Sequence, residues 1–170
     1  FWITYNGEFY NYKEIRAELK SLGQQFYSQS DTEVILAAYA KWGVNCIRRF
    51  RGMFAFALID KRPPAGSPEL LLVRDRLGIK PLLYFDNQKE ILFASELRAI
   101  LASGRVDRKV DPEALLDFLA VGAVSQPRTI IANVKTLPAG HWLEIRGKER
   151  KLVKYWDLHE DTEVLRKELK

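Results

Sequence analysis

The fold is decided by a stretch near the start of the sequence, which reads Tyr5-Asn6-Gly7-Glu8-Phe9-Tyr10-Asn11. It follows residues 1–5, whose aromatic and β-branched side chains favour a half-buried strand. Asn6-Gly7 can then take the positive φ that turns a backbone sharply. One interpretation is a hairpin turn, because Asn-Gly between apolar runs is the strongest short hairpin signal.

The second interpretation is a strand end that carries chemistry. The Asn6 side-chain amide and the Gly7 backbone N–H can converge on one point as an oxyanion hole, with Glu8 beside them to hold a cation. Asp31 lies in Ser30-Asp31-Thr32-Glu33, a capping box that opens a helix. By itself Asp31 is expected to cap the helix and to compensate its dipole. If the two segments are neighbours, both carboxylates face one pocket.

Composition limits the class of protein. The 170 residues allow one domain, or one domain and a fragment, and 47% are apolar, which is enough for a core. The longest apolar run, residues 53–59, is far shorter than the roughly 20 residues that span a bilayer, so we expect a soluble protein with no membrane partner. The net charge of +5 is scattered, and we expect no nucleic-acid partner.

Cysteine and histidine usage excludes several kinds of site. The single cysteine, Cys46, forms no disulfide framework and fits a reducing, cytoplasmic setting. We expect it to be a buried structural thiol, since no base lies near it in sequence. The two histidines, His141 and His159, are far apart and predict no metal site.

The remaining pattern predicts helices and antiparallel hairpins. Asn11 is expected to cap a helix over residues 12–22, and Asp111 one that begins at Pro112. Arg74 and Asp75 are expected to clamp the turn that follows them. Other expected elements are a short edge strand over residues 24–28, a helix from 31 to 42, a helix from 95 or 96 to 101, and a polar helical tail over 161–170. Three antiparallel hairpins are also expected, which pair residues 52–60 with 70–75, 82–85 with 91–94, and 137–145 with 151–155.

Seven motifs in order carry a resemblance that covers almost the whole chain. They are Tyr5-Asn-Gly-Glu-Phe-Tyr-Asn11, Ser30-Asp-Thr-Glu-Val-Ile35, Gly52-Met-Phe-Ala-Phe-Ala-Leu58, Arg74-Asp-Arg-Leu-Gly-Ile-Lys-Pro81, Phe93-Ala-Ser-Glu96, Pro138-Ala-Gly140 and Tyr155-Trp156. This set resembles the glutaminase domain of glutamine-hydrolysing asparagine synthetases. The resemblance implies an α+β, N-terminal-nucleophile fold: an αββα sandwich of two antiparallel sheets between helical layers, here without its N-terminal segment.

The same resemblance implies roles for four residues. Asn6 and Gly7 would be the oxyanion donors, and Glu8 and Asp31 would hold the α-ammonium of glutamine. In such enzymes an N-terminal cysteine attacks the amide and its own α-amine is the base. This chain has neither that cysteine nor the upstream arginine that binds the glutamine carboxylate, so we expect the chain by itself to be inactive.

The resemblance also implies a domain division. Residues 1–156 would be a partial glutaminase domain, and residues 157–170 a linker into a C-terminal synthetase domain that uses ATP and Mg²⁺ to amidate aspartate with the ammonia. No cofactor is expected in this chain, and a homodimer is left open. Two alternatives also stay open: a non-catalytic glutamine-binding or regulatory module, and the amidotransferase half of a relative that amidates another acid.

Overall fold

A computed structural model describes residues 1–62, 70–159 and 162, which form an α+β protein with antiparallel strands. The helices are α1 (Tyr12–Ser21), α2 (Asp31–Trp42), the 3-10 helix η1 (Gly43–Arg49), α3 (Leu97–Ala102) and α4 (Pro112–Val121). The strands are β1 (Trp2–Phe9), β2 (Gly52–Ile59), β3 (Leu70–Arg74), β4 (Leu83–Asp86), β5 (Ile91–Ala94), β6 (Val134–Thr136), β7 (His141–Arg146) and β8 (Glu149–Lys154).

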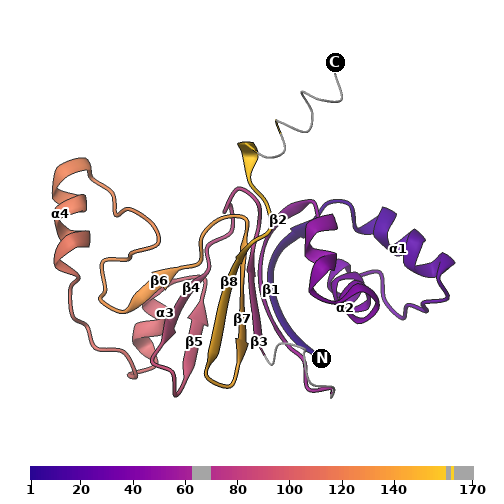
Figure 1. Cartoon of the computed structure of the whole chain (residues 1–170), viewed down its shortest axis with the longest axis horizontal. Coiled ribbons are helices and arrows are strands. Elements are labelled where there is room, and N and C mark those ends of the chain that lie inside the picture. Colours follow the sequence, from indigo (N-terminus) through magenta and orange to yellow (C-terminus); the bar gives the residue numbers. More distant parts are fainter. Residues whose placement is uncertain (63–69, 160–161, 163–170) are drawn as a thin grey trace.

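The strands form two antiparallel sheets that pack face to face. The larger sheet has the order β1-β2-β3-β7-β8 and the smaller one the order β5-β4-β6. Helices α1 and α2 cover one face of the larger sheet, the smaller sheet covers the other, and α3 lies on its outer side (Figure 1). These layers confirm the expected sandwich of two antiparallel sheets between helical layers. Within the described residues, the helices are too short or too polar to cross a membrane.

Strand β2 shows why the layers pack as they do. Its large side chains, among them Phe54, Phe56 and Leu58, point to the α1–α2 side and join the main core. Its small ones, Ala55 and Ala57, point to the other side and join the core between the sheets. Because side chains alternate along a strand, this Phe-Ala repeat gives the helices bulky partners and lets the two sheets approach closely.

The three expected hairpins are present, but the strand expected over residues 24–28 and the cap expected at Asn11 are not. Residues 24–28 form no strand, because their polar groups bond to side chains of the flanking helices and not to a neighbouring strand. Asn11 precedes α1 without capping it: its amide donates to the Arg49 carbonyl and its side-chain oxygen accepts from the Arg51 N–H. The expected tail over residues 161–170 lies almost wholly outside the described residues.

Asn6 and Gly7 lie inside β1, so the hairpin-turn interpretation is wrong. Strand β1 continues to Phe9 and pairs with β2 along its whole length. Gly7 has φ +147°, and a Cβ there would lie 2.1 Å from the Met53 carbonyl oxygen. The glycine therefore serves the close approach of β1 to β2, and it does not turn the chain.

The expected Arg74–Asp75 clamp is confirmed, and it reaches further than its own turn. Asp75 is fully buried, and its carboxylate accepts from four backbone N–H groups at 2.9–3.2 Å, those of Phe54, Leu77, Ile79 and Lys80. The Arg74 guanidinium donates to the carbonyl oxygens of Gly78, Lys80 and Leu137 and to the Gln126 side chain. The pair thus connects β2, the turn after β3 and the segment that follows β6.

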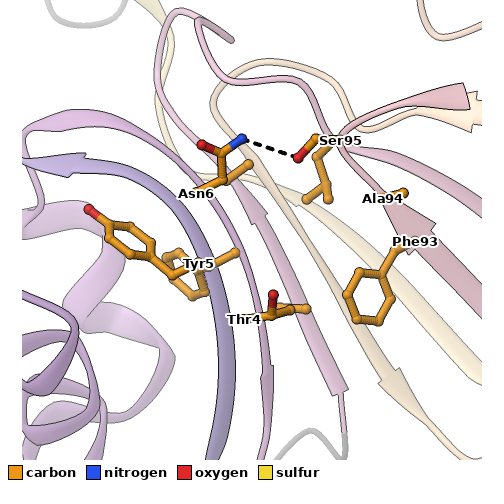
Figure 2. Close-up of a pocket in the computed structure, with 10 residues that line it drawn as sticks. Thr4, Tyr5, Asn6, Phe93, Ala94 and Ser95 are labelled. Carbon is orange, nitrogen blue, oxygen red and sulfur yellow. Dashed lines mark hydrogen bonds between the residues drawn. The ribbon is translucent and has the colours of Figure 1, made fainter. Parts of the chain in front are cut away.

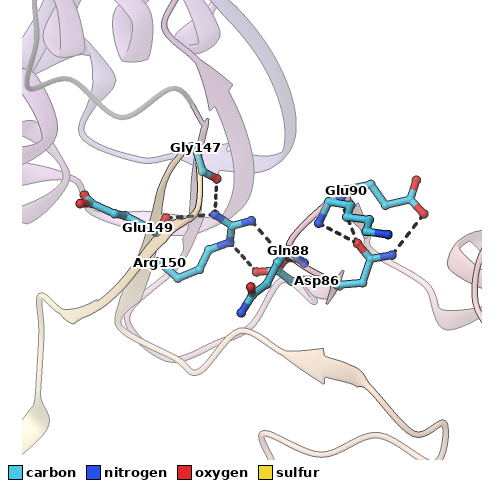
Figure 3. A network of polar contacts seen from close by, with 8 residues as sticks. Asp86, Gln88, Glu90, Gly147, Glu149 and Arg150 are labelled. Atoms are coloured by element: carbon cyan, nitrogen blue, oxygen red, sulfur yellow. Dashed lines mark hydrogen bonds and ion pairs between the residues drawn. The ribbon is translucent and has the colours of Figure 1, made fainter.

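A second polar contact joins the two sheets at their far end. Figure 3 shows Arg150, from the β7–β8 hairpin, reaching Asp86 at the end of β4. Two N–O contacts of 2.5 and 3.2 Å make the pair bidentate. Burial by itself would raise the pKa of Asp86, but the hydrogen bonds from Arg150 and the Gln88 N–H, with the charges of Arg150 and Lys135, lower it below its usual value.

We predict that Asp75→Asn destabilises the protein strongly. An amide offers one acceptor oxygen where the carboxylate offers two, so buried N–H groups lose partners, at a cost on the order of 3 kcal/mol in unfolding free energy. Urea unfolding measures the effect. The control is Asp107→Asn, since Asp107 is exposed and its change should fall within about 0.5 kcal/mol of wild type. Equal effects of the two variants would contradict the clamp.

Gly7→Ala should also be destabilising, by about 3 kcal/mol or more, because the new methyl group meets a backbone oxygen that cannot move without parting β1 from β2. Gly147→Ala is the matched control. Gly147 also has a positive φ, +53°, but a Cβ there meets nothing within 4 Å, so we expect only about 1 kcal/mol. Thermal unfolding of both variants tests this, and a Gly7→Ala protein as stable as the control would refute the close-approach explanation.

Candidate functional site

The alternation of β1 places Asn6 and Glu8 on the same exposed face of the strand. Asn6 faces the end of β5, where its Nδ2 donates to Ser95 Oγ at 3.2 Å (Figure 2). Asn6 and Ser95 line a small pocket of about 110 Å³ between the two sheets, together with Thr4 and Phe93. The Asn6 amide is therefore held between the sheets and is not part of a loop.

Tyr5 points the other way, towards the helices (Figure 2). Its hydroxyl donates to Asp31 Oδ2 at 2.7 Å, and the Phe9 backbone N–H donates to the same oxygen at 3.2 Å. The pKa of Tyr5 is raised far above its usual value, first by burial, then by the hydrogen bond to Asp31 and the charges of Asp31 and Glu8. Tyr5 thus stays protonated and ties Asp31 to the strand that carries Asn6 and Glu8.

Asp31 is the first residue of α2, but it is not the residue that caps the helix. Ser30 has that role, because its Oγ accepts from the Thr32 N–H at 3.1 Å. The interpretation of Asp31 as a cap is therefore wrong. Its side chain instead reaches across to β1, where two donors fix it.

Glu8 and Asp31 line one pocket, as the sequence predicts for neighbouring segments. The pocket measures about 490 Å³, and its wall consists of Glu8, Phe9, Tyr10, Tyr12, Gln29, Ser30 and Asp31. Two carboxylates without a basic side chain among these lining residues make a site that favours a cation. Phe9 and the tyrosines give the pocket an apolar body beside this charge.

The structure thus brings two of the four predicted site residues into one pocket and places the other two beside it. Asn6 lines the neighbouring pocket between the sheets, and Gly7 lies between Asn6 and Glu8 on β1. Sequence reasoning missed the role of Tyr5, which was assigned only to the strand. It also placed Ser95 at the possible start of a helix and gave it no contact with Asn6. The signal for Tyr5 was available, because a tyrosine beside a predicted carboxylate pair is a natural donor to it.

The chain's cysteine and His141 lie away from this chemistry. Cys46 is 1% exposed within the main core, and burial raises its pKa to about 12, so it is a structural thiol as expected. His141 Nδ1 is bonded to the Ala139 carbonyl oxygen at 2.7 Å. Among the described residues, no three His, Cys, Asp or Glu side chains form a group that could hold a metal ion.

Comparison with known proteins shows the family to which the chain belongs. A family model described as "Glutamine amidotransferase domain" matches residues 1–156. The chain is 36% identical to asparagine synthetase [glutamine-hydrolyzing] 3 of Bacillus subtilis over 94% of its own length, and 38% identical to asparagine synthetase [glutamine-hydrolyzing] 1 of that organism over 86%. It spans only 25% and 22% of these relatives.

A solved structure shows the same fold at lower identity. Glutamine phosphoribosylpyrophosphate amidotransferase from B. subtilis superposes with a TM-score of 0.61 and 20% identity, over 91% of this chain and 29% of that one. The agreement of this fold with the α+β architecture confirms the N-terminal-nucleophile fold class. The chain belongs to the glutamine amidotransferase domain family and is homologous to the glutaminase half of asparagine synthetases.

Proposed function

We propose that this chain is the glutaminase part of an asparagine synthetase-like enzyme, which hydrolyses glutamine and supplies the ammonia for ATP-dependent amidation of aspartate. The observation that carries the proposal is the pair Glu8 and Asp31 on one pocket. Two carboxylates beside an apolar wall suit a ligand with an ammonium group and a methylene chain. Glutamine has both.

The spacing along β1 fits the two ends of glutamine. Asn6 and Glu8 are two residues apart on one strand face, which corresponds to about 7 Å along the strand. The α-ammonium of glutamine and its side-chain amide carbon are separated by four bonds. With the ammonium at Glu8 and Asp31, the amide carbonyl lies towards Asn6 and Gly7.

Asn6 and Gly7 are proposed to act on the developing negative charge. When a thiolate adds to the amide carbon, the C–S bond forms and the carbonyl oxygen becomes an oxyanion. One Nδ2 hydrogen of Asn6 goes to Ser95, and the second can point at the oxyanion with the Gly7 N–H. The C–N bond then breaks, ammonia leaves with the proton held by the base, and water hydrolyses the thioester to glutamate.

The attacking thiol is proposed to come from outside these 170 residues. Cys46, the chain's single cysteine, is buried and has a raised pKa, so it cannot act at the β1 site. We propose further that residues 157–170 lead into a synthetase domain. ATP and Mg²⁺ are expected to act there, and no step assigned to the residues of this chain uses them.

The buried state of Cys46 also keeps one second candidate open, a glutamine-binding or regulatory module without catalysis. The gene sequence that precedes the codon for Phe1 separates the two functions. A cysteine directly after the initiator methionine favours the enzyme. Its absence favours the binding module.

In the full-length protein, Asn6→Ala should lower kcat for glutamine hydrolysis by about 10² to 10³ with little change in KM, because one donor to the oxyanion is lost. Asp31→Ala should mainly raise KM, because it removes a charge partner of bound substrate and transition state alike. Steady-state release of glutamate measures both effects. Asn45→Ala is the control, since Asn45 is exposed on η1.

Synthesis driven by free ammonia should continue in both variants, because it does not use the glutamine pocket. The proposal is wrong if Asn6→Ala leaves kcat intact. It is equally wrong if both variants lose ammonia-driven synthesis together, since Asn6 would then have only a structural role in β1.

A further inference from the structure

The segment between α1 and α2 forms one wall of the pocket without regular secondary structure. Its residues Gln29 and Ser30 line the same pocket as Glu8. Tyr27, in the middle of the segment, is 92% exposed, so packing does little to hold the backbone there. At Tyr27 and Ser28 the backbone is held by hydrogen bonds to side chains of the two flanking helices.

Glu33 supplies one of these side chains from the first turn of α2. Its carboxylate accepts from the backbone N–H groups of Tyr27 and Ser28, both at 2.8 Å, and from the Ser28 hydroxyl at 2.7 Å. The capping box predicted from the sequence would have turned Glu33 back to the Ser30 N–H. Glu33 binds the segment instead.

Arg16 holds the same segment from α1. The arginine is 8% exposed, its guanidinium lies 4.6 Å from the centre of the Phe26 ring, and it donates to the Ser28 carbonyl oxygen. A cation over an aromatic face is an attractive arrangement when it is desolvated. Side chains of both helices therefore bind one residue, Ser28. The Glu33 carboxylate of α2 accepts from its N–H and hydroxyl groups, and the Arg16 guanidinium of α1 donates to its carbonyl oxygen.

Hydrogen bonds connect Ser28 to the residues that line the pocket. Ser28 Oγ accepts from the Ser30 N–H at 3.2 Å, and Ser30 Oγ in turn accepts from the Thr32 N–H at 3.1 Å. Gln29 and Asp31 lie between these fixed points. The position of the wall and the start of the helix that carries Asp31 thus depend on Ser28.

We propose that Glu33 and Arg16 are positioning residues for glutamine binding, which act by clamping Ser28 and so pre-forming the pocket wall at Gln29 and Ser30. The proposal rests on the glutaminase function proposed above. A wall that is ordered in advance lowers the conformational entropy lost when the ligand binds. Neither residue lines the pocket, so each acts through the segment and not through contact with substrate.

The ionised form of Glu33 is the form that can accept all three hydrogen bonds. Its pKa is lowered, chiefly by the hydrogen bond from the Ser28 side chain and then by that from the Tyr27 N–H. At neutral pH the carboxylate is therefore available to the clamp. In a Glu33→Gln variant the side chain would keep one acceptor oxygen and would turn its NH₂ group towards the donors of Tyr27 or Ser28.

The test compares Glu33→Gln with Glu14→Gln in titrations of the full-length protein with glutamine. Glu14 is a matched control, because it is also a glutamate in the first turn of a helix and is exposed. We expect Glu33→Gln to weaken glutamine binding by about tenfold or more and to speed amide exchange at Tyr27 and Ser28. Glu14→Gln should change neither quantity by more than about twofold.

Ser28 gives a second, independent pair of variants. Ser28→Ala removes the hydroxyl that links Glu33 to the Ser30 N–H and should weaken binding, whereas Ser28→Thr keeps a hydroxyl and should restore it. Faster exchange in Glu33→Gln with unchanged glutamine affinity would overturn the positioning role. Failure of the wild-type protein to bind glutamine would overturn the proposed function itself, and wild-type exchange rates in Glu33→Gln would show that the clamp does not exist.

Discussion

The buried carboxylate of Asp75 is the contact on which the rest of the structure depends. A charge with no exposure to solvent is costly unless hydrogen bonds satisfy it, and here four backbone N–H groups do so. They come from β2 and from the turn between the two sheets. Arg74, its neighbour, holds the carbonyl oxygens of that turn and of Leu137. A buried polar network that is only partly hydrogen-bonded is less stable than an apolar core. The hydrogen bonds of Asp75 and Arg74 therefore fix the path of the chain from β3 in the larger sheet to β4 in the smaller one.

That constraint explains how residues from distant segments form one site. The smaller sheet must lie over the β1–β2 side of the larger sheet for Ser95 to meet Asn6, although 89 residues separate them. On the other face of β1, α2 must lie close enough for Asp31 to accept from Tyr5 and Phe9. Strand β1 is thus held on both faces, by the smaller sheet at Asn6 and by α2 at Asp31. The close approach of the β1 and β2 backbones at Gly7 holds β1 in the position that allows both contacts.

Much of this could be predicted from the sequence where local patterns decide the outcome. The hairpins follow from apolar runs that are separated by turn residues. The start of α4 follows from Asp111 before Pro112, and the Asp111 carboxylate does accept from the backbone N–H groups of Glu113 and Ala114.

The errors occur where distant partners compete for a polar group. Asn11 bonds to the last residue of η1 and to Arg51 and does not cap α1. Glu33 bonds to Ser28 and not to Ser30, and Gly7 allows the close approach of β2 and does not form a turn. Glu8 and Asp31 were predicted as a pair because a resemblance linked them. A tyrosine next to the predicted carboxylates could have suggested a hydrogen bond from the Tyr5 hydroxyl, but the contact with Asp31 itself depends on how α2 packs against β1.

The proposed recognition of the glutamine α-ammonium by Glu8 and Asp31 is tested most directly by a comparison of two ligands. Calorimetric titration of the full-length protein with glutamine and with 4-carbamoylbutanoate, which is glutamine without its amino group, measures the contribution of that group alone. A charge-assisted contact to the paired carboxylates predicts that the second ligand binds roughly tenfold to a hundredfold more weakly. In Asp31→Asn the difference between the two ligands should shrink. Equal affinities of the wild-type protein for both ligands would contradict the account.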